Sequence, residues 1–400
     1  MKSVVVVSHE IDNLDIAAEE LAAQAKEKLG LLRNAIGIVY CDADVDVSRL
    51  GKLLHESMGI DIVGNTTTAT LERNSGYNDM GISFCVMSAD DVDFTVGYTG
   101  DLAKETYPQT IKETYTKART QVSADPGLIL VFAPYITDLT SENYMEVLDE
   151  ASGGAPVFGG VATDHYDLQY QKTFYNGQEF SRGLVFVLLS GNIKPVFAMK
   201  HDFGATVEKK GIITKSSENI VYTIGNQPFK DFVSSMVPVP DEEVVVYYFQ
   251  STPFVVELPD YEKDEQPVVR VLVTVDHEKG SGSFLSKMPE GSVIYLNHFQ
   301  RANLSESCKA ALVDINNQMD ENKDYEYSMM FISSCNARHL LMADAKNLES
   351  NILCEHMKDF NQNINAMGFY GFGEICPTGK KAGGTVRNRF HNISFAVCAI

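Results

Sequence analysis

The sequence predicts an α/β protein with mixed β-sheets covered by helices, because one glycine-turn pattern recurs along the chain. Apolar runs end in glycine turns at Gly64, at Gly159-Gly160 and at Gly371-x-Gly373. Each turn follows a strand-like run and a helical stretch, and another apolar run comes after it. We therefore expect repeated strand, helix, strand, glycine turn, strand units, arranged in two related domains.

Hydrophobic patterning places the elements of each unit. The opening strands are expected at 36–41, 128–133 and 329–333. Helices with spaced apolar positions are expected at 47–58, 141–151 and 340–358. The return strands are expected at 82–87, 184–189 and 393–398. Because strands alternate with helices in places and run consecutively in others, the sheets are expected to be mixed.

The remaining patterns suggest where the domains divide. They predict strands at 4–8, 268–275 and 293–296 and helices at 15–29, 102–122, 229–236 and 305–319. Asp12 or Asn13 is the capping candidate of the helix at 15–29. Only strands are indicated between 185 and 213, so a junction is expected near 205–225. A chain of 400 residues with 44% hydrophobic content favours two domains, 1–210 and 211–400.

Charge and cysteine usage narrow the choice of partners. The net charge of −21 argues against nucleic-acid binding, which relies on Lys and Arg to neutralise phosphates. The apolar run at 4–7 is too short for a signal-peptide core or a membrane span. Seven dispersed cysteines without a Cys-x-x-Cys motif indicate reduced thiols rather than disulfides or a zinc site. We expect a cytoplasmic protein that binds neither nucleic acid nor membranes.

Two groups of motifs resemble one family. The stretch Gly159-Gly160-Val161-Ala162-Thr163-Asp164, with Phe174-Tyr175-Asn176-Gly177, resembles the FIST N-terminal domain, here over 1–210. The FIST C-terminal domain, here over 211–400, is similar in Ser334-Cys335-Asn336-Ala337-Arg338, Gly368-Phe369-Tyr370-Gly371-Phe372-Gly373-Glu374 and Phe390-His391-Asn392-Ile393-Ser394. The resemblance implies a sensory domain of intracellular signal transduction that binds a small molecule, with amino acids among the ligands, and that acts with a signalling protein partner.

The charged residues near the third glycine turn are the main ligand-binding candidates. Cys335 follows a strand and stands where the next helix is expected to begin, and Arg338 comes one turn later. Arg338 is suited to a carboxylate and Glu374 to an ammonium, the two groups of an amino acid. The structural alternative is a buried Arg338–Glu374 ion pair with Cys335 as a core residue.

Backbone and hydroxyl groups at the glycine turns extend this candidate site. Gly159, Gly160, Gly371 and Gly373 would let the backbone approach a ligand closely. Thr66 and Thr67 offer hydroxyl and backbone hydrogen bonds for an anion, although threonine is also an ordinary strand and turn residue. Asp164-His165 suggests either a second ligand or ion site or a capped turn, and this dipeptide is far from a metal motif. We expect neither a metal nor a cofactor.

Two other functions remain open. A thiol-dependent enzyme would use Cys335 as nucleophile and His339, four positions later, as base. No side chain at a recognisable spacing orients His339, so binding without turnover is the preferred hypothesis. Cys376 could form a redox pair with Cys335, or both could be unrelated cysteines. The third alternative is a protein-interaction scaffold.

Overall fold

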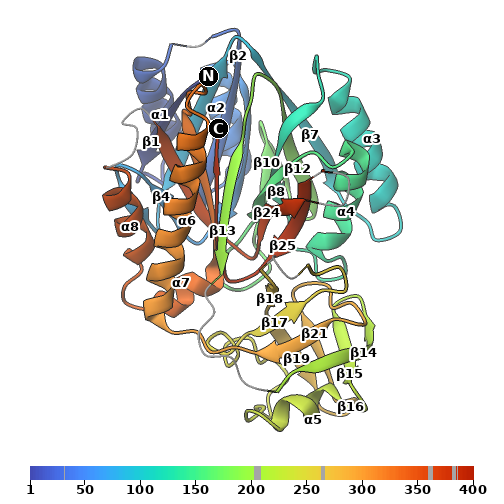
Figure 1. The fold of residues 1–400 in the computed structure, drawn as a ribbon. Helices are drawn as coiled ribbons and strands as arrows, with labels where there is room; N and C mark the ends of the chain where they lie inside the picture. The colour runs from blue at the N-terminus through green and yellow to red at the C-terminus, as the bar shows by residue number, and fades with distance from the viewer. Residues whose placement is uncertain (31, 202–208, 263–265, 359–363, 381–383, 385) are drawn as a thin grey trace.

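The computed structural model describes the chain except residues 31, 202–208, 263–265, 359–363, 381–383 and 385 (Figure 1). Three units with the same strand order make up the larger part. In each unit, the first strand pairs antiparallel with the last, the last pairs antiparallel with the second, and the second pairs parallel with the third. Mixed sheets built from a repeated unit are therefore confirmed.

The bounds of the units follow chain order. The first unit contains β1 (Lys2–Ser8), α1 (Leu14–Lys28), β2 (Asn34–Asp42), α2 (Val47–Met58), β3 (Asp61–Thr67) and β6 (Ile82–Ala89). The second contains β7 (Val92–Asp101), α3 (Tyr107–Arg119), β8 (Pro126–Ala133), α4 (Ser141–Ser152), β9 (Val157–Val161) and β12 (Gly183–Gly191). The third contains β13 (Val196–His201), α6 (Arg301–Glu321), β22 (Met329–Cys335), α7 (Asn336–Met342), α8 (Leu348–His356), β23 (Asn365–Gly371) and β26 (Ser394–Ala399).

Exchanged hairpins join the units to one another. The hairpins are β4 (Thr70–Glu72) with β5 (Gly76–Asn78), β10 (Thr173–Tyr175) with β11 (Gln178–Phe180), and β24 (Glu374–Lys380) with β25 (Val386–His391). The first pairs with β23, the second with β3 and the third with β9. Each six-stranded sheet therefore contains a hairpin from another unit.

The apolar residues form an inner core shared by the units and outer cores belonging to each. Ile38, Leu130 and Phe331, one from each unit, belong to the same central cluster. Separate clusters lie between each sheet and its own helices, because strand residues alternate between the two faces. The helices lie on the outside, as Figure 1 shows for α3 and α6. None of the helices in the described part of the chain is long and apolar enough to cross a membrane.

An antiparallel sheet is inserted into the third unit, between β13 and α6 (Figure 1, bottom). It contains β14 (Gly211–Ser217), β15 (Ile220–Ile224), β16 (Gln227–Pro228), α5 (Phe229–Ser234), β17 (Phe254–Glu257), β18 (Val268–Arg270), β19 (Leu272–Asp276), β20 (Ser281–Phe284) and β21 (Val293–Leu296). The inserted sheet has its own apolar cluster, which includes Phe229, Phe254 and Phe284. β13, which precedes it, pairs with β26 at the other end of the third unit.

Two sequence expectations differ from the structure. The helix expected at 340–358 is broken into α7 and α8, and Ala343, the residue after α7, has a φ of 48° that an α-helix cannot contain. The single strand expected at 268–275 is divided into β18 and β19. The strand segment is strongly apolar throughout, and this composition concealed its break; in the helical segment, spaced apolar residues continue across the break at Ala343.

The glycine pattern marks equivalent positions, with one change. Gly64 lies opposite Val39, Gly159 opposite Val131 and Gly368 opposite Ile332 in the three parallel strand pairs. The third equivalent glycine is therefore Gly368, and Gly373 follows it in the turn before β24. A Cβ atom at Gly64 would lie 2.0 Å from the Val39 carbonyl oxygen, so this position requires close backbone approach.

Candidate functional site

Arg338, the predicted carboxylate anchor, lies inside the third unit. It is fully buried, and its Nη2 atom is 2.7 Å from Glu349 Oε1 on α8. Nη1 donates a hydrogen bond to Ser307 Oγ at 3.0 Å, and Nη2 donates to the Leu304 carbonyl at 3.0 Å. The ion pair thus joins α7 to α8, the hydrogen bonds join α7 to α6, and the charge of Arg338 is balanced within the protein.

Glu374, the predicted ammonium anchor, is also fully buried. Its Oε2 atom accepts hydrogen bonds from Ser394, from Oγ at 2.7 Å and from the backbone N–H at 3.2 Å. Burial raises the pKa of this carboxyl well above its usual range, while the Ser394 hydrogen bonds and Arg338 lower it by less. The raised pKa favours the protonated, neutral form of Glu374, which is a weaker partner for an ammonium group than a carboxylate.

Cys335 and His339 do not have the electrostatics of a thiolate and its base. Burial raises the pKa of the Cys335 thiol well above its usual range, and the negative charge of Glu374, where that group is ionised, raises it further. Burial lowers the pKa of His339 to about 4. Both ring nitrogens of His339 face hydroxyls, Nε2 that of Tyr77 at 2.9 Å and Nδ1 that of Tyr166 at 2.7 Å. All seven cysteines, including Cys376, are free thiols.

The remaining predicted residues lie where the three units meet. Thr66 Oγ1 donates to the Thr163 carbonyl at 2.8 Å, and Thr67 Oγ1 donates to the Tyr370 carbonyl at 2.9 Å. These bonds connect the first unit to the second and third, so both hydroxyls have partners within the protein.

The glycines of the same region permit close packing between protein segments. A Cβ atom added at Gly159, Gly160, Gly371 or Gly373 would lie 3.0 Å or less from another protein atom. At Gly159, for example, that atom is the Val131 carbonyl oxygen, 1.9 Å away. The space that these glycines leave is therefore occupied by neighbouring strands and side chains.

An open cleft, called the charged cleft below, lies where α4, β25 and the inserted sheet meet. This cleft has a volume of about 340 Å³. Its lining residues are Glu142, Met145, Glu146, Asp149, Leu258, Pro259, Asp260, Arg270, Lys287, Pro289, Arg387, Asn388, Arg389 and Phe390. The volume lies within the range of small-ligand pockets, and acidic and basic side chains both line it.

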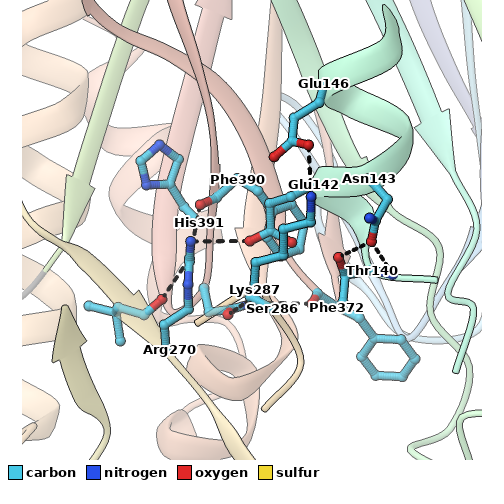
Figure 2. Close-up of polar contacts among 12 residues, drawn as sticks. Thr140, Glu142, Asn143, Glu146, Arg270, Ser286, Lys287, Phe372, Phe390 and His391 are labelled. Carbon is cyan, nitrogen blue, oxygen red and sulfur yellow. Dashed lines mark hydrogen bonds and ion pairs between the residues drawn. The ribbon is translucent and has the colours of Figure 1, made fainter. Parts of the chain in front are cut away.

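Arg270 forms the buried wall of this cleft (Figure 2). Its side chain is 2% exposed, and Nη2 lies 3.1 Å from Glu142 Oε1 on α4. Nη1 donates to the Phe390 carbonyl at 3.0 Å. The Nε–H group has no hydrogen-bond partner among the described residues. Arg270 therefore keeps an unused donor beside a cavity, and burial of such a donor is costly.

Further ion pairs cross the cleft at its more exposed edge. Lys287 Nζ of the inserted sheet lies 2.7 Å from Glu146 Oε2 of α4, as Figure 2 also shows. Arg389 Nη2 of β25 lies 2.9 Å from Asp260 Oδ2. Burial raises the pKa of Glu142, and Arg270 opposes that shift. Opposite charges thus face each other across the junction between the inserted sheet and the three units.

A smaller apolar cavity of about 60 Å³ lies between α7 and the inserted part. Cys335 and Asn336 form one wall, and Tyr247 and Val271 of the inserted part form another. Asn336 is 2% exposed, and neither polar atom of its side chain has a hydrogen-bond partner among the described residues. Val271, between β18 and β19, lines this cavity, while its neighbour Arg270 lines the charged cleft.

Residues 35–227 match the FIST N domain, and residues 231–377 match the FIST C domain. The chain belongs to the FIST family. FIST domains are assigned a sensory role in signalling, and a small ligand is the partner that this role implies. No curated protein gives a significant match to the sequence.

Solved structures similar to this FIST chain are distant. A chorismatase is 8% identical over 100% of this chain and 98% of its own, with a TM-score of 0.36. A cyanuric acid hydrolase from A. caulinodans is 12% identical over 74% of this chain and 99% of its own, with a TM-score of 0.26. Another cyanuric acid hydrolase is 9% identical over 50% and 72%, with a TM-score of 0.28. These similarities support no inference about activity.

The sequence analysis missed the residues of the charged cleft. Arg270 had a recognisable signal, since it is the single charged residue in the apolar run from Val268 to Val273. A charge in such a run is seldom buried without a partner. Glu142 had no comparable signal, because acidic residues are common in the first turn of a helix.

Proposed function

We propose that this chain is a sensor that binds an amino acid or a similar zwitterionic molecule in the charged cleft. The observation that carries the proposal is the unused Nε–H of the buried Arg270 side chain, which lines a cavity of about 340 Å³. A carboxylate bound in the cleft would lie within the field of the guanidinium, and it would accept the Nε–H hydrogen bond once this side chain turns toward the cavity. Lys287, on the same side of the cleft, adds a second positive charge.

The acidic residues would hold the ammonium group. Glu142 and Glu146 lie on one face of α4, four residues apart, and both line the cleft. The carboxylate of a zwitterion could pair with Arg270 and Lys287, and its ammonium group could pair with Glu142 and Glu146. These contacts would replace the existing ion pairs of Glu142 with Arg270 and of Glu146 with Lys287, and no net charge would be left buried. The ligand therefore needs both charges, because an anion or a cation alone would leave one side of the cleft unbalanced.

Binding at this place would connect separate parts of the chain. The cleft is lined by the second unit, the hairpin β24–β25 and the inserted sheet. A bound molecule would hold these parts together, and a signalling partner that recognises their arrangement would respond to the ligand. Cys335 enters the proposal only as a wall of the apolar cavity, while Arg338 is omitted because Glu349, Ser307 and Leu304 accept its hydrogen bonds.

A thermal-shift screen with the twenty amino acids and matched organic acids and amines tests the proposal. A zwitterion at one hundred times its dissociation constant would stabilise the fold by about 2.7 kcal/mol, whereas the corresponding acid or amine would give a smaller shift. Lys287→Met should weaken the shift. Lys279→Met is the matched control, since Lys279 pairs with Asp276 on the exposed part of the inserted sheet. Absence of any shift, or equal shifts in both variants, would reject this site.

A further inference from the structure

Three side chains from two units meet at the carboxyl end of β2. Asp42 ends that strand, Asp44 follows in the loop before α2, and His165 lies in the loop after β9. His165 Nε2 is 3.2 Å from Asp42 Oδ1 and 3.6 Å from Asp44 Oδ2. One nitrogen or oxygen atom from each residue lies within 4.8 Å of the other two. The three groups are therefore close enough to approach one cation together.

The buried carboxylate of Asp42 supplies an independent indication. Its side chain is 2% exposed, and its Oδ2 atom has no hydrogen-bond partner among the described residues. Its Oδ1 atom accepts the Asp44 N–H at 2.9 Å. Within the described chain, His165 Nε2 is the basic group that lies near both carboxylates, and no Lys or Arg lies at ion-pair distance from either of them. A buried carboxylate with an unpaired oxygen requires a proton or a cation.

We propose that Asp42, Asp44 and His165 bind a divalent transition-metal cation such as Zn²⁺ or Mn²⁺. One imidazole and two carboxylates are ligands that these ions accept, and the two negative charges would balance the ion. With bonds of about 2.0–2.1 Å in tetrahedral geometry, neighbouring ligand atoms lie roughly 3.3 Å apart. The two separations from His165, 3.2 and 3.6 Å, are close to this value.

The exposure of the site fits an ion with an open coordination position. The side chains of His165 and Asp44 are 45% and 79% exposed, while Asp42 is buried beneath them. Water can therefore complete the coordination from the solvent side. The ion would also join the first unit to the second, because Asp42 and Asp44 precede α2 and His165 follows β9.

Metal binding would fix the loop that carries His165. The Asp164 carboxylate accepts the backbone N–H groups of Leu168, Gln169 and Tyr170 within that loop. The hydroxyl of Tyr166 faces His339 Nδ1, and Tyr166 also lines the small apolar cavity. An ion bound to His165 would thus restrain the next residue, Tyr166, which lines that cavity.

Calorimetric titration of the chelator-treated full chain with Zn²⁺ tests the site. We expect wild type to bind one more equivalent of Zn²⁺ than either His165→Ala or Asp44→Asn. His298→Ala, which removes an exposed histidine of the inserted part, is the control and should bind as wild type does. Asp44 is the most exposed ligand, so Asp44→Asn tests the site even if His165→Ala folds poorly.

Co²⁺ absorption distinguishes this site from binding by cysteine. Co²⁺ at the proposed site should show ligand-field bands of nitrogen and oxygen coordination without a thiolate charge-transfer band. Hydrogen exchange in the loop 164–170 should slow when Zn²⁺ is added to wild type and remain unchanged in Asp44→Asn. Zn²⁺ binding that persists equally in both ligand variants, thiolate bands, or no binding by wild type would overturn the proposal.

Discussion

Two arginines of this chain are almost completely buried, but their surroundings differ. Arg338 lies within the third unit and donates to Glu349, Ser307 and Leu304. Arg270 lies where the inserted sheet meets the second unit, beside a cavity of about 340 Å³ and with Nε–H unpartnered among the described residues. The first guanidinium holds helices together, and the second is the one that we propose for ligand binding. Burial of a charge therefore does not by itself distinguish structural support from recognition.

The largest effect is expected from Arg338→Leu. Removing this side chain leaves Glu349 buried without its ion-pair partner, because both side chains are fully buried. The free energy of unfolding should fall by roughly 3–5 kcal/mol. Urea denaturation of the ligand-free chain measures this loss.

The double variant Arg338→Leu/Glu349→Leu is the control for this prediction. It removes both charges and should recover a large part of the stability that the single variant loses. A single variant that stays as stable as wild type but loses the ligand-induced thermal shift would reverse the comparison and make Arg338 the recognition residue.

A second prediction concerns His339, the residue next to Arg338 on α7. Its pKa is about 4 in the folded chain, against about 6.5 in an unfolded one. As pH falls from about 6.5 to 4, the unfolded state takes up a proton that the folded state does not. This residue should therefore reduce the free energy of unfolding by up to about 3 kcal/mol over that range.

The difference between wild type and His339→Gln isolates this contribution. Both proteins contain the other buried histidines, so their common pH dependence cancels in the comparison. Denaturation curves across the range should show a steeper acid decline for wild type. Equal declines would mean that His339 is protonated in the folded chain and that α7 is more open to water than its burial indicates.

At the cleft, Arg270→Met should cost less than Arg338→Leu. Glu142 would lose its partner, but its side chain is 13% exposed and can gain hydration. A loss of about 2–3 kcal/mol is expected, and Arg270→Met/Glu142→Met should recover most of it. Both variants should lose the amino-acid thermal shift. If the recovered double variant still binds, Arg270 is a structural residue like Arg338.

The sequence was informative about repeated local structure and less so about long-range partners. Helix α2 was predicted with its observed bounds, and the apolar runs before Gly64 and Gly159 form parallel strands. These features follow from short-range periodicity and from backbone approach. The exchange of hairpins between units could not be predicted from the sequence. The sequence of a hairpin does not indicate which unit it will pair with.

The candidate site was harder to predict for the same reason. Arg338 and Glu374 were chosen by residue type and order, yet the ion-pair partner of Arg338 is Glu349, which a sequence pattern cannot single out. The cleft residues Glu142 and Arg270 are far apart in the chain and meet only because the inserted sheet lies against α4. Residue type indicated which side chains could bind a charged ligand. Tertiary contacts determined which of these side chains already have a partner within the protein.

The smallest effect is expected from Glu374→Gln. Burial raises the pKa of Glu374 well above its usual range and so favours its neutral form, and a neutral amide of similar shape can still accept the Ser394 hydrogen bonds. Near pH 5 the free energy of unfolding should change by less than about 1 kcal/mol. A group with a raised folded pKa contributes stability below its unfolded pKa of about 4.3 and loses it as pH rises. Wild type should therefore lose stability relative to Glu374→Gln as pH rises above that value.

Glu349→Gln is the matched control, because it breaks the buried ion pair and should be strongly destabilising at the same pH. A Glu374→Gln variant as unstable as Glu349→Gln would show that Glu374 is ionised and that the third unit holds a second charge needing a partner.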